Sequence, residues 1–272
     1  MNTSFNLITG PWVPVVGSDG SNVLVSLLDV FTRAGIADLN ADPCERIALT
    51  RLLLAISHRA LELAGAHPEE RVNSEKVRQS LVQCVPDYLQ IWRGVFNLGD
   101  TEKGFLRLPN ITAGKAPETP TAEYIQFQRR TKATDLTAGQ LGVGLLTFQV
   151  CYPGGLGAGN LRWGTKTIST DKNRSADCPP SMEGGPIYAF IIGRTLLDII
   201  SRNLLGRRQI QDQFGVPVWE QVPQSPEDAA AINNMVSTFL GRMLPISRDN
   251  GCGQRSGTLL VAKKKFPMSG TS

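Results

Sequence analysis

The sequence predicts an α+β fold, a mixed globular domain with several helices, short antiparallel strands and long loops. Two short apolar runs separated by a Gly/Asp turn open the chain, which is the pattern of a β-hairpin. Apolar residues between positions 43 and 92 recur with helical spacing. Glycine and proline, at 27 and 17 of 272 residues, exceed their average usage, which favours a loop-rich fold over a helical bundle.

The first expected elements are a hairpin and a short helix. Residues 12–16 and 23–25 are β-rich apolar runs, and the turn between them includes Gly-Ser-Asp-Gly at 17–20. Ser26 then precedes the apolar run 27–31, and a serine in this position caps the start of a helix. The opening of the chain therefore predicts strand, strand and helix, in that order.

Two longer helices are expected next. Asp42 and Pro43 are residue types preferred at the cap and the first position of a helix, and Gly65 indicates its end. Leucine and isoleucine cover much of this helix, so we expect it to be buried inside a domain. The second helix is expected over 74–92, with a break or kink at Pro86.

The second half of the chain alternates helices with irregular segments. A helix is expected near 135–152, and its glycines at 139, 142 and 144 lower its stability unless close packing requires small residues. The stretch 153–186 predicts a long loop, which in a compact domain is usually functional or disordered. The other expected elements are an irregular region at 94–121, helices at 196–205 and 228–243, and a last strand at 259–261.

The net charge of +4 hides an uneven distribution. Residues 1–100 carry 8 Lys and Arg against 11 Asp and Glu, whereas residues 101–272 carry 20 against 13. A basic segment of this kind is typical of proteins that contact phosphates, although a solvated surface gives the same pattern. The basic residues between 129 and 175 are Arg129, Arg130, Lys132, Arg162, Lys166, Lys172 and Arg174, against Asp135 and Asp171.

Several classes of protein are not expected. The sequence has no apolar run of membrane-spanning length and no signal peptide at its N-terminus, so we expect a cytoplasmic protein without a membrane partner. Its five cysteines form no CxxC pair, which indicates reduced thiols rather than disulfides or a zinc site. His58 and His67 lack a further ligand at metal spacing, so we expect ordinary satisfied or surface histidines, no metal and no cofactor.

Two segments approach nucleotide-binding motifs without matching them. Residues 159–167 would be a phosphate loop, but Thr165 separates Gly164 from Lys166 and displaces the lysine. Residues 155–159 lack the GxGxxG spacing and follow a predicted helix rather than a strand. A nucleotide-dependent enzyme is therefore an alternative and not the expectation.

Several short segments follow one another in a recognisable order. They are 5–15 (FNLITGPWVPV), 19–20, 25–27, 49–61, 96–98 with 104–106, 153–157, 184–186, 196–205, 217–220 and 247–248. Their order resembles that of the CasA family, the large subunit of the type I-E CRISPR surveillance complex Cascade. The resemblance covers about residues 5–261 and depends on the ordered series, since no single motif decides it.

The resemblance implies a non-catalytic subunit that binds target duplex DNA at the PAM and helps start the R-loop at the 5′ end of the guide RNA. In such effectors base pairing reads the sequence and the protein reads the PAM. Gly154, Gly155 and Gly157 match the glycine loop of the family, where missing side chains let the backbone approach the minor groove. A simple helix-ending loop is the alternative.

The resemblance also implies contacts to RNA and to phosphates. The loop 109–134 is expected to face the 5′ end of the guide and a neighbouring subunit, with 153–186 as the second nucleic-acid-facing loop. The expected DNA- or RNA-binding residues are Asn110, Gln128, Arg129, Arg130, Lys132, Arg162, Lys166, Lys172 and Arg174, with Lys263, Lys264 and Lys265 as further DNA contacts.

The family pattern is matched in part. CasA proteins are longer and continue with duplex-opening hairpins and a C-terminal helical bundle, so these functions are not carried over. We expect a single domain over 1–262 and a basic flexible tail at 263–272. The expected partners are the guide RNA, double-stranded target DNA, other Cascade subunits, especially the one holding the 5′ handle, and an effector nuclease of open identity. A purely structural cap of the complex is the alternative.

Overall fold

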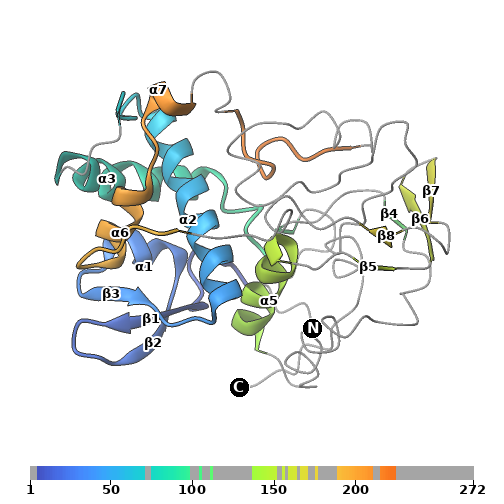
Figure 1. Ribbon diagram of the computed structural model, residues 1–272, viewed down its shortest axis with the longest axis horizontal. Coiled ribbons are helices and arrows are strands. Elements are labelled where there is room, and N and C mark those ends of the chain that lie inside the picture. Colours follow the sequence, from blue (N-terminus) through green and yellow to red (C-terminus); the bar gives the residue numbers. More distant parts are fainter. Residues whose placement is uncertain are drawn as a thin grey trace.

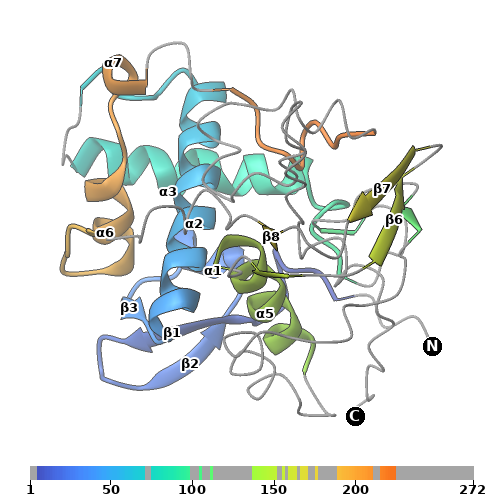
Figure 2. The same ribbon diagram turned by 45° about the vertical axis from the view of Figure 1, so that its right-hand side comes forward.

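The computed structural model describes residues 5–70, 75–98, 104–105, 111–112, 137–151, 155–156, 159–163, 166–170, 175–176, 189–210 and 215–224. The fold is α+β, as the sequence predicts. One antiparallel sheet lies at one side of the molecule with helices over it, and the later strands lie at the opposite side (Figure 1). Turning the molecule by 45° keeps the two groups of strands apart (Figure 2).

The first sheet confirms the predicted hairpin. Strand β1 (Val13–Gly17) pairs antiparallel with β2 (Asn22–Val25), with Val13 opposite Val25. Gly20 in the turn has φ of +81°, a conformation that glycine adopts without strain. The other edge of β1 pairs with β3 (Ile36–Leu39), which the sequence did not predict because residues 36–39 contain no run of β-rich apolar residues.

Helix α1 (Leu27–Thr32) begins where the sequence predicts. The Ser26 hydroxyl accepts a hydrogen bond from the Asp29 backbone N–H at 3.0 Å, and the Asp29 carboxylate accepts one from the Ser26 N–H at 3.0 Å. This reciprocal capping box satisfies two backbone donors that have no partner inside the helix.

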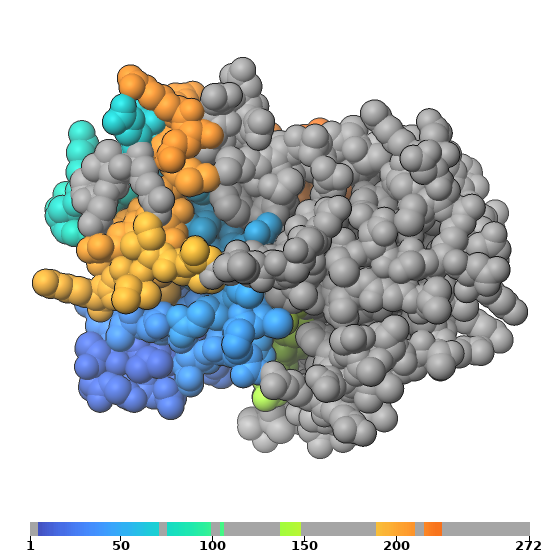
Figure 3. Space-filling view, in the orientation of Figure 1, coloured from blue at the N-terminus to red at the C-terminus, as the bar shows by residue number. Residues whose placement is uncertain are grey.

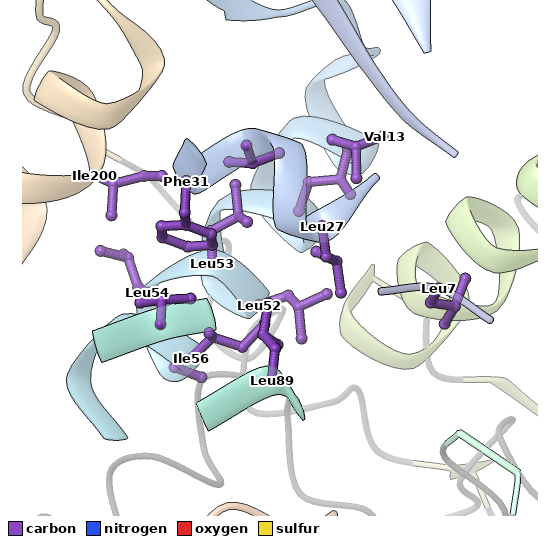
Figure 4. Packing of buried hydrophobic residues seen from close by; sticks show 14 of the residues in the cluster. Leu7, Val13, Leu27, Phe31, Leu52, Leu53, Leu54, Ile56, Leu89 and Ile200 are labelled. Atoms are coloured by element: carbon purple, nitrogen blue, oxygen red, sulfur yellow. The ribbon is translucent and has the colours of Figure 1, made fainter. Parts of the chain in front are cut away.

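Helix α2 (Pro43–Leu63) is the centre of the core, as expected from its leucines. Leu49, Leu52, Leu53 and Ile56 are fully buried. Side chains from α1, α2, α3 and α6 meet in this core (Figure 4). The helix ends before Gly65, whose φ of +62° lets the chain turn away.

Helix α3 (Glu75–Ile91) runs through Pro86 without interruption, so of the predicted break or kink the break is wrong. Proline removes one backbone hydrogen bond and crowds the preceding turn, which destabilises a helix interior. Buried residues on both sides of it, among them Leu81, Val85 and Leu89, pack into the core. This tertiary packing offsets the local cost and holds the helix together.

Helix α5 (Ala138–Cys151) confirms the predicted third long helix and explains two of its glycines. A Cβ at Gly139 would lie 3.2 Å from Trp12, and one at Gly142 would lie 2.9 Å from Leu7. These two glycines permit α5 to approach the N-terminal segment closely, whereas a Cβ at Gly144 would meet nothing within 4 Å.

The stretch 153–186 is not the continuous loop that the sequence predicts, because it contains four strands. They are β5 (Gly155–Leu156), β6 (Gly159–Trp163), β7 (Lys166–Thr170) and β8 (Ser175–Ala176). The preceding loop, 109–134, contains β4 (Ile111–Thr112), which pairs with β6. Strands of two to five residues between glycines escape a prediction that relies on longer apolar runs.

Helix α6 (Leu196–Asn203) is also confirmed, and Thr195 caps it by accepting a hydrogen bond from the Asp198 N–H at 3.1 Å. The Asp198 carboxylate pairs with Arg78 of α3 at 2.8 Å, which joins the two helices. Helix α7 (Arg207–Ile210) follows and was not predicted. In the space-filling view α6 lies at the surface between the first sheet and α7 (Figure 3).

Some sequence predictions fall outside the described residues. These are the helix at 228–243, the strand at 259–261 and the basic tail at 263–272. Within the part of the chain that is described, no helix combines the length and apolar composition needed to cross a membrane.

A buried polar network attaches the segment 215–224 to α2 and α3. The Arg59 guanidinium donates to both carboxylate oxygens of Glu220, with Nη2 at 2.8 Å from Oε2. The Tyr88 hydroxyl donates to Glu220 at 2.7 Å and accepts from the Trp219 indole N–H at 2.6 Å. Burial raises the pKa of Tyr88, so its hydroxyl keeps its proton and donates. The Trp219 ring packs edge-on against Phe96, at 5.6 Å between centroids.

Removal of the Glu220 carboxylate should destabilise the fold strongly. The Glu220 side chain is only 6% exposed, so Glu220→Ala leaves the Arg59 charge and the Tyr88 hydroxyl without their partner. We expect the free energy of unfolding to fall by about 3 kcal/mol, measured by urea denaturation followed by circular dichroism.

Glu70→Ala is the matched control, because it breaks another Arg–Glu pair of 2.8 Å whose side chains are 71% and 68% exposed. We expect a loss of about 0.5 kcal/mol or less for this exposed pair. Equal losses for the two variants would contradict the structural role of the Glu220 network.

Candidate nucleic-acid interface

The candidate interface is a nested pair of β-ladders that follows α5. In the outer ladder Gly155 pairs with Ala176 and Leu156 with Ser175. In the inner ladder β6 and β7 pair from Gly159–Thr170 to Trp163–Lys166. The outer ladder therefore encloses the inner hairpin along the chain. The inner strands lie away from β1–β3 in both ribbon views (Figures 1 and 2).

Gly155 occupies a strand rather than an open loop. Its register partner is Ala176 of β8, so this part of the predicted glycine loop is tied into a two-stranded ladder. A glycine in a strand marks a place where another backbone or a ligand can approach closely. Gly154 and Gly157, which flank this strand, lie outside the described residues.

Arg162 and Lys166, which the sequence analysis groups in one basic segment, occupy opposite faces of their sheet. Arg162 lies opposite Thr167 and Lys166 lies opposite Trp163. Directly opposed residues share a face, and successive residues of a strand alternate between faces. Residues 162 and 163 are on different faces, so the register separates the two cations.

The near-match to a phosphate loop is a β-hairpin. Trp163 and Lys166 are register partners, so the antiparallel strands β6 and β7 are separated by only two positions in the sequence. A phosphate loop leads from a strand into a helix, whose N-terminus supports the anion. Here Lys166 begins a strand, and the geometry does not resemble that motif.

Most of the other predicted contacts lie outside the described residues. They are Asn110, Gln128, Arg129, Arg130, Lys132, Lys172, Arg174, Lys263, Lys264 and Lys265. The sequence analysis did not identify the residues that lie beside Arg162 across the sheet. The one signal that could have found them is the alternation of polar and apolar residues in 159–163 and 166–170. Thr112 of β4 and Thr167 of β7 lie opposite Arg162 on either side.

The structure also brings together the two histidines, which the sequence analysis treats separately. His67 Nδ1 lies 3.1 Å from the Pro68 carbonyl and therefore carries the proton. Its Nε2 then accepts from His58 Nδ1–H at 2.8 Å, and His58 Nε2 accepts from the Leu205 N–H at 3.4 Å. Both rings are neutral in this chain of hydrogen bonds, which confirms that they are satisfied histidines.

The pKa shifts of His58 and His67 agree with two neutral rings. Burial lowers the pKa of His58 to about 3, with a further contribution from His67. Burial also lowers the pKa of His67, against the carboxylates of Glu62 and Glu69, which raise it. No group of three potential ligands that could hold a metal occurs in the described ranges. The pair therefore links α2 to the segment before α7, and we assign it no chemistry.

The histidine pair predicts a pH-dependent stability. Because the folded pKa of His58 lies below its unfolded value of about 6.5, its contribution is complete above pH 6.5 and is lost as the pH falls toward 3. Because of His58, we expect the free energy of unfolding to be about 2 kcal/mol lower at pH 5 than at pH 7. Urea denaturation at the two pH values measures this change.

His58→Phe is the informative variant, because it keeps a ring of similar size and cannot be protonated. It should be less stable at pH 7, since Leu205 and His67 lose their partner, but its stability should change less on acidification. Parallel pH dependence in the wild type and the variant would rule out this role of His58.

Comparison with known proteins identifies a family that this chain resembles. The model of the family described as CRISPR-associated protein Cse1 matches residues 6–249. A curated relative, CRISPR-associated protein CasA/Cse1 of Thermus thermophilus, is 28% identical over 236 residues. That alignment spans 80% of this chain and 42% of the relative, so the chain covers less than half of the relative's length.

Solved structures share the fold. Cse1 from Thermobifida fusca aligns with a TM-score of 0.58 and 22% identity over 84% of this chain and 46% of that one. Cse1 from Acidimicrobium ferrooxidans gives 0.59 and 20% over 82% and 43%. A chain of a CRISPR RNA-guided surveillance complex gives 0.53 and 17% over 82% and 47%.

Proposed function

Because the chain belongs to the CRISPR-associated Cse1 family, we propose that it is a non-catalytic subunit of a type I-E-like RNA-guided surveillance complex. In this proposal it binds target duplex DNA at the PAM and helps start the R-loop at the 5′ end of the guide RNA. The observation that carries the proposal is the family match over residues 6–249. A structural neighbour that is part of an RNA-guided surveillance complex adds support.

The glycine segment supplies the contact to the PAM. The minor groove is about 6 Å wide, and the base edges in it offer mainly hydrogen-bond acceptors. A backbone without Cβ atoms fits this space and can donate its N–H groups. We assign this role to Gly154, Gly155 and Gly157, of which Gly155 is held in β5.

The basic and amide residues supply the remaining contacts. Asn110, Gln128, Arg129, Arg130 and Lys132 belong to the segment that we assign to the guide RNA and the subunit holding its 5′ handle. We assign Lys172, Arg174 and the tail lysines to phosphate attraction, which depends on salt. The other partners are the remaining Cascade subunits and an effector nuclease.

Gly155→Asp tests the glycine segment. An aspartate adds bulk and a negative charge where the backbone is to meet the duplex, so we expect affinity for PAM-bearing DNA to fall at least about tenfold. The assay is a gel-shift titration of the assembled complex on duplexes with and without a PAM.

Ser175→Asp is the control, because Ser175 lies in the same two-stranded ladder and on the opposite face from Gly155. It should retain nearly wild-type affinity and PAM preference. An unchanged PAM preference in Gly155→Asp would remove the glycine segment from the proposal.

A structural cap of the complex is the second candidate, since a family match over residues 6–249 is equally expected of a subunit that only completes the assembly. In that case another protein reads the PAM or recruits the effector. A complex assembled without this chain separates the two functions. Loss of PAM-dependent binding supports the first proposal, and reduced assembly with unchanged PAM choice supports the cap.

A nucleotide-dependent enzyme would require residues 159–167 to bind phosphates as a loop. Since these residues form a hairpin, we expect the assembled complex to hydrolyse no ATP above the buffer blank and Lys166→Ala to change nothing in that assay. Hydrolysis that disappears in Lys166→Ala would reverse this conclusion.

A further inference from the structure

The sheet formed by β4, β6 and β7 has two chemically different faces. Strand β6 is central, with β4 on one side and β7 on the other. On one face Thr112, Arg162 and Thr167 form a row across the three strands. Asn160 and Ser169 form the next row on the same face. Every position of these two rows is polar, and Arg162 is at the centre.

The opposite face is mostly apolar. Its rows place Ile111 and Lys166 on either side of Trp163, and Leu161 opposite Ile168. An antiparallel sheet with one apolar and one polar face packs the apolar face against other parts of the protein and leaves the polar face to solvent or a polar partner. The face of Arg162, which we call the polar face, is therefore the one suited to a charged ligand.

The charge of the sheet favours an anion. The twelve residues of β4, β6 and β7 include Arg162 and Lys166 and no Asp or Glu. Guanidinium, hydroxyl and amide groups are the side chains that most often donate to the oxygens of a nucleic-acid backbone. An arginine can do so with two parallel hydrogen bonds. The register places three residues of these types, Thr112, Arg162 and Thr167, in one row of the sheet.

We propose that the polar face, centred on Arg162, contacts the phosphate backbone of the target duplex DNA, and that Lys166 on the opposite face does not. The inference rests on the proposed function, since it concerns the duplex whose PAM the glycine segment approaches. Three Cα–Cα steps of 3.8 Å separate Leu156 of β5 from Gly159 of β6, so the two lie within about 11 Å. One duplex can therefore reach both.

Arg162→Gln and Lys166→Gln form the first matched pair, because each removes one positive charge from the same hairpin. Gel-shift titrations of the assembled complex at several salt concentrations give the affinity and its salt dependence. We expect Arg162→Gln to weaken binding about tenfold on duplexes with and without a PAM, and to reduce the salt slope by about one. Lys166→Gln should stay within about twofold of the wild type.

Thr167→Lys and Thr170→Lys form the second pair, which does not depend on a loss of function. Both threonines lie in β7, at positions 167 and 170 on opposite faces. A lysine at 167 should tighten binding and steepen the salt slope by about one, whereas a lysine at 170 should leave both unchanged. Circular dichroism and complex assembly verify that each variant folds.

The outcomes distinguish the inference from the function on which it rests. The proposed role of the polar face would be wrong if the two variants of a pair had equal effects, or if only the variants at Lys166 and Thr170 had an effect. PAM recognition would remain intact in either case. A wild-type complex without PAM-dependent binding would overturn the proposed function and the inference with it. A selective change of PAM preference in Arg162→Gln would assign Arg162 to base reading and contradict a phosphate contact.

Discussion

The burial of α2 is the constraint on which the described structure depends. Because this helix is covered along most of its length, polar side chains on it must find partners inside the protein. Consecutive residues solve this in different ways. The Ser57 hydroxyl donates to the Leu53 carbonyl at 2.7 Å, His58 pairs with His67, and Arg59 pairs with Glu220. The Arg59 contact joins α2 to Glu220, which lies far along the chain, so satisfying a buried polar group also fixes the position of that segment.

The same core determines where the candidate interface begins. Helix α5 contacts α2 and approaches Trp12 through Gly139 and Gly142, which leaves little freedom in its position. The chain then enters β5 four residues after α5 ends. In the proposed function the glycine segment approaches DNA closely, and a backbone that is already held in place loses less conformational entropy on binding.

Local signals predicted most of the elements, and tertiary contacts explain the failures. Ser26, Asp42 and Gly65 act through neighbouring residues, so the sequence located α1 and α2 well. The break that Pro86 indicated does not occur, because distant packing holds its helix together. The contact of His58 with His67 could not be predicted, since it depends on how the chain turns at Gly65. At the candidate site the sequence indicated a basic, glycine-rich segment, but only strand pairing distinguishes the face of Arg162 from that of Lys166.

The register of β6 has a consequence for comparing this chain with its relatives. Positions alternate between faces along a strand, so with the pairing of Gly159 fixed, one residue inserted between Gly159 and Arg162 would transfer the arginine to the other face of the sheet. The number of basic residues and the net charge would stay the same. The face of a residue depends on whether it lies an odd or an even number of positions from a fixed register pair, such as Gly159 with Thr170. This spacing therefore says more about where a charge lies than the number of cations in the segment does. Two homologues with identical composition here can differ in the face of the sheet on which a basic residue lies.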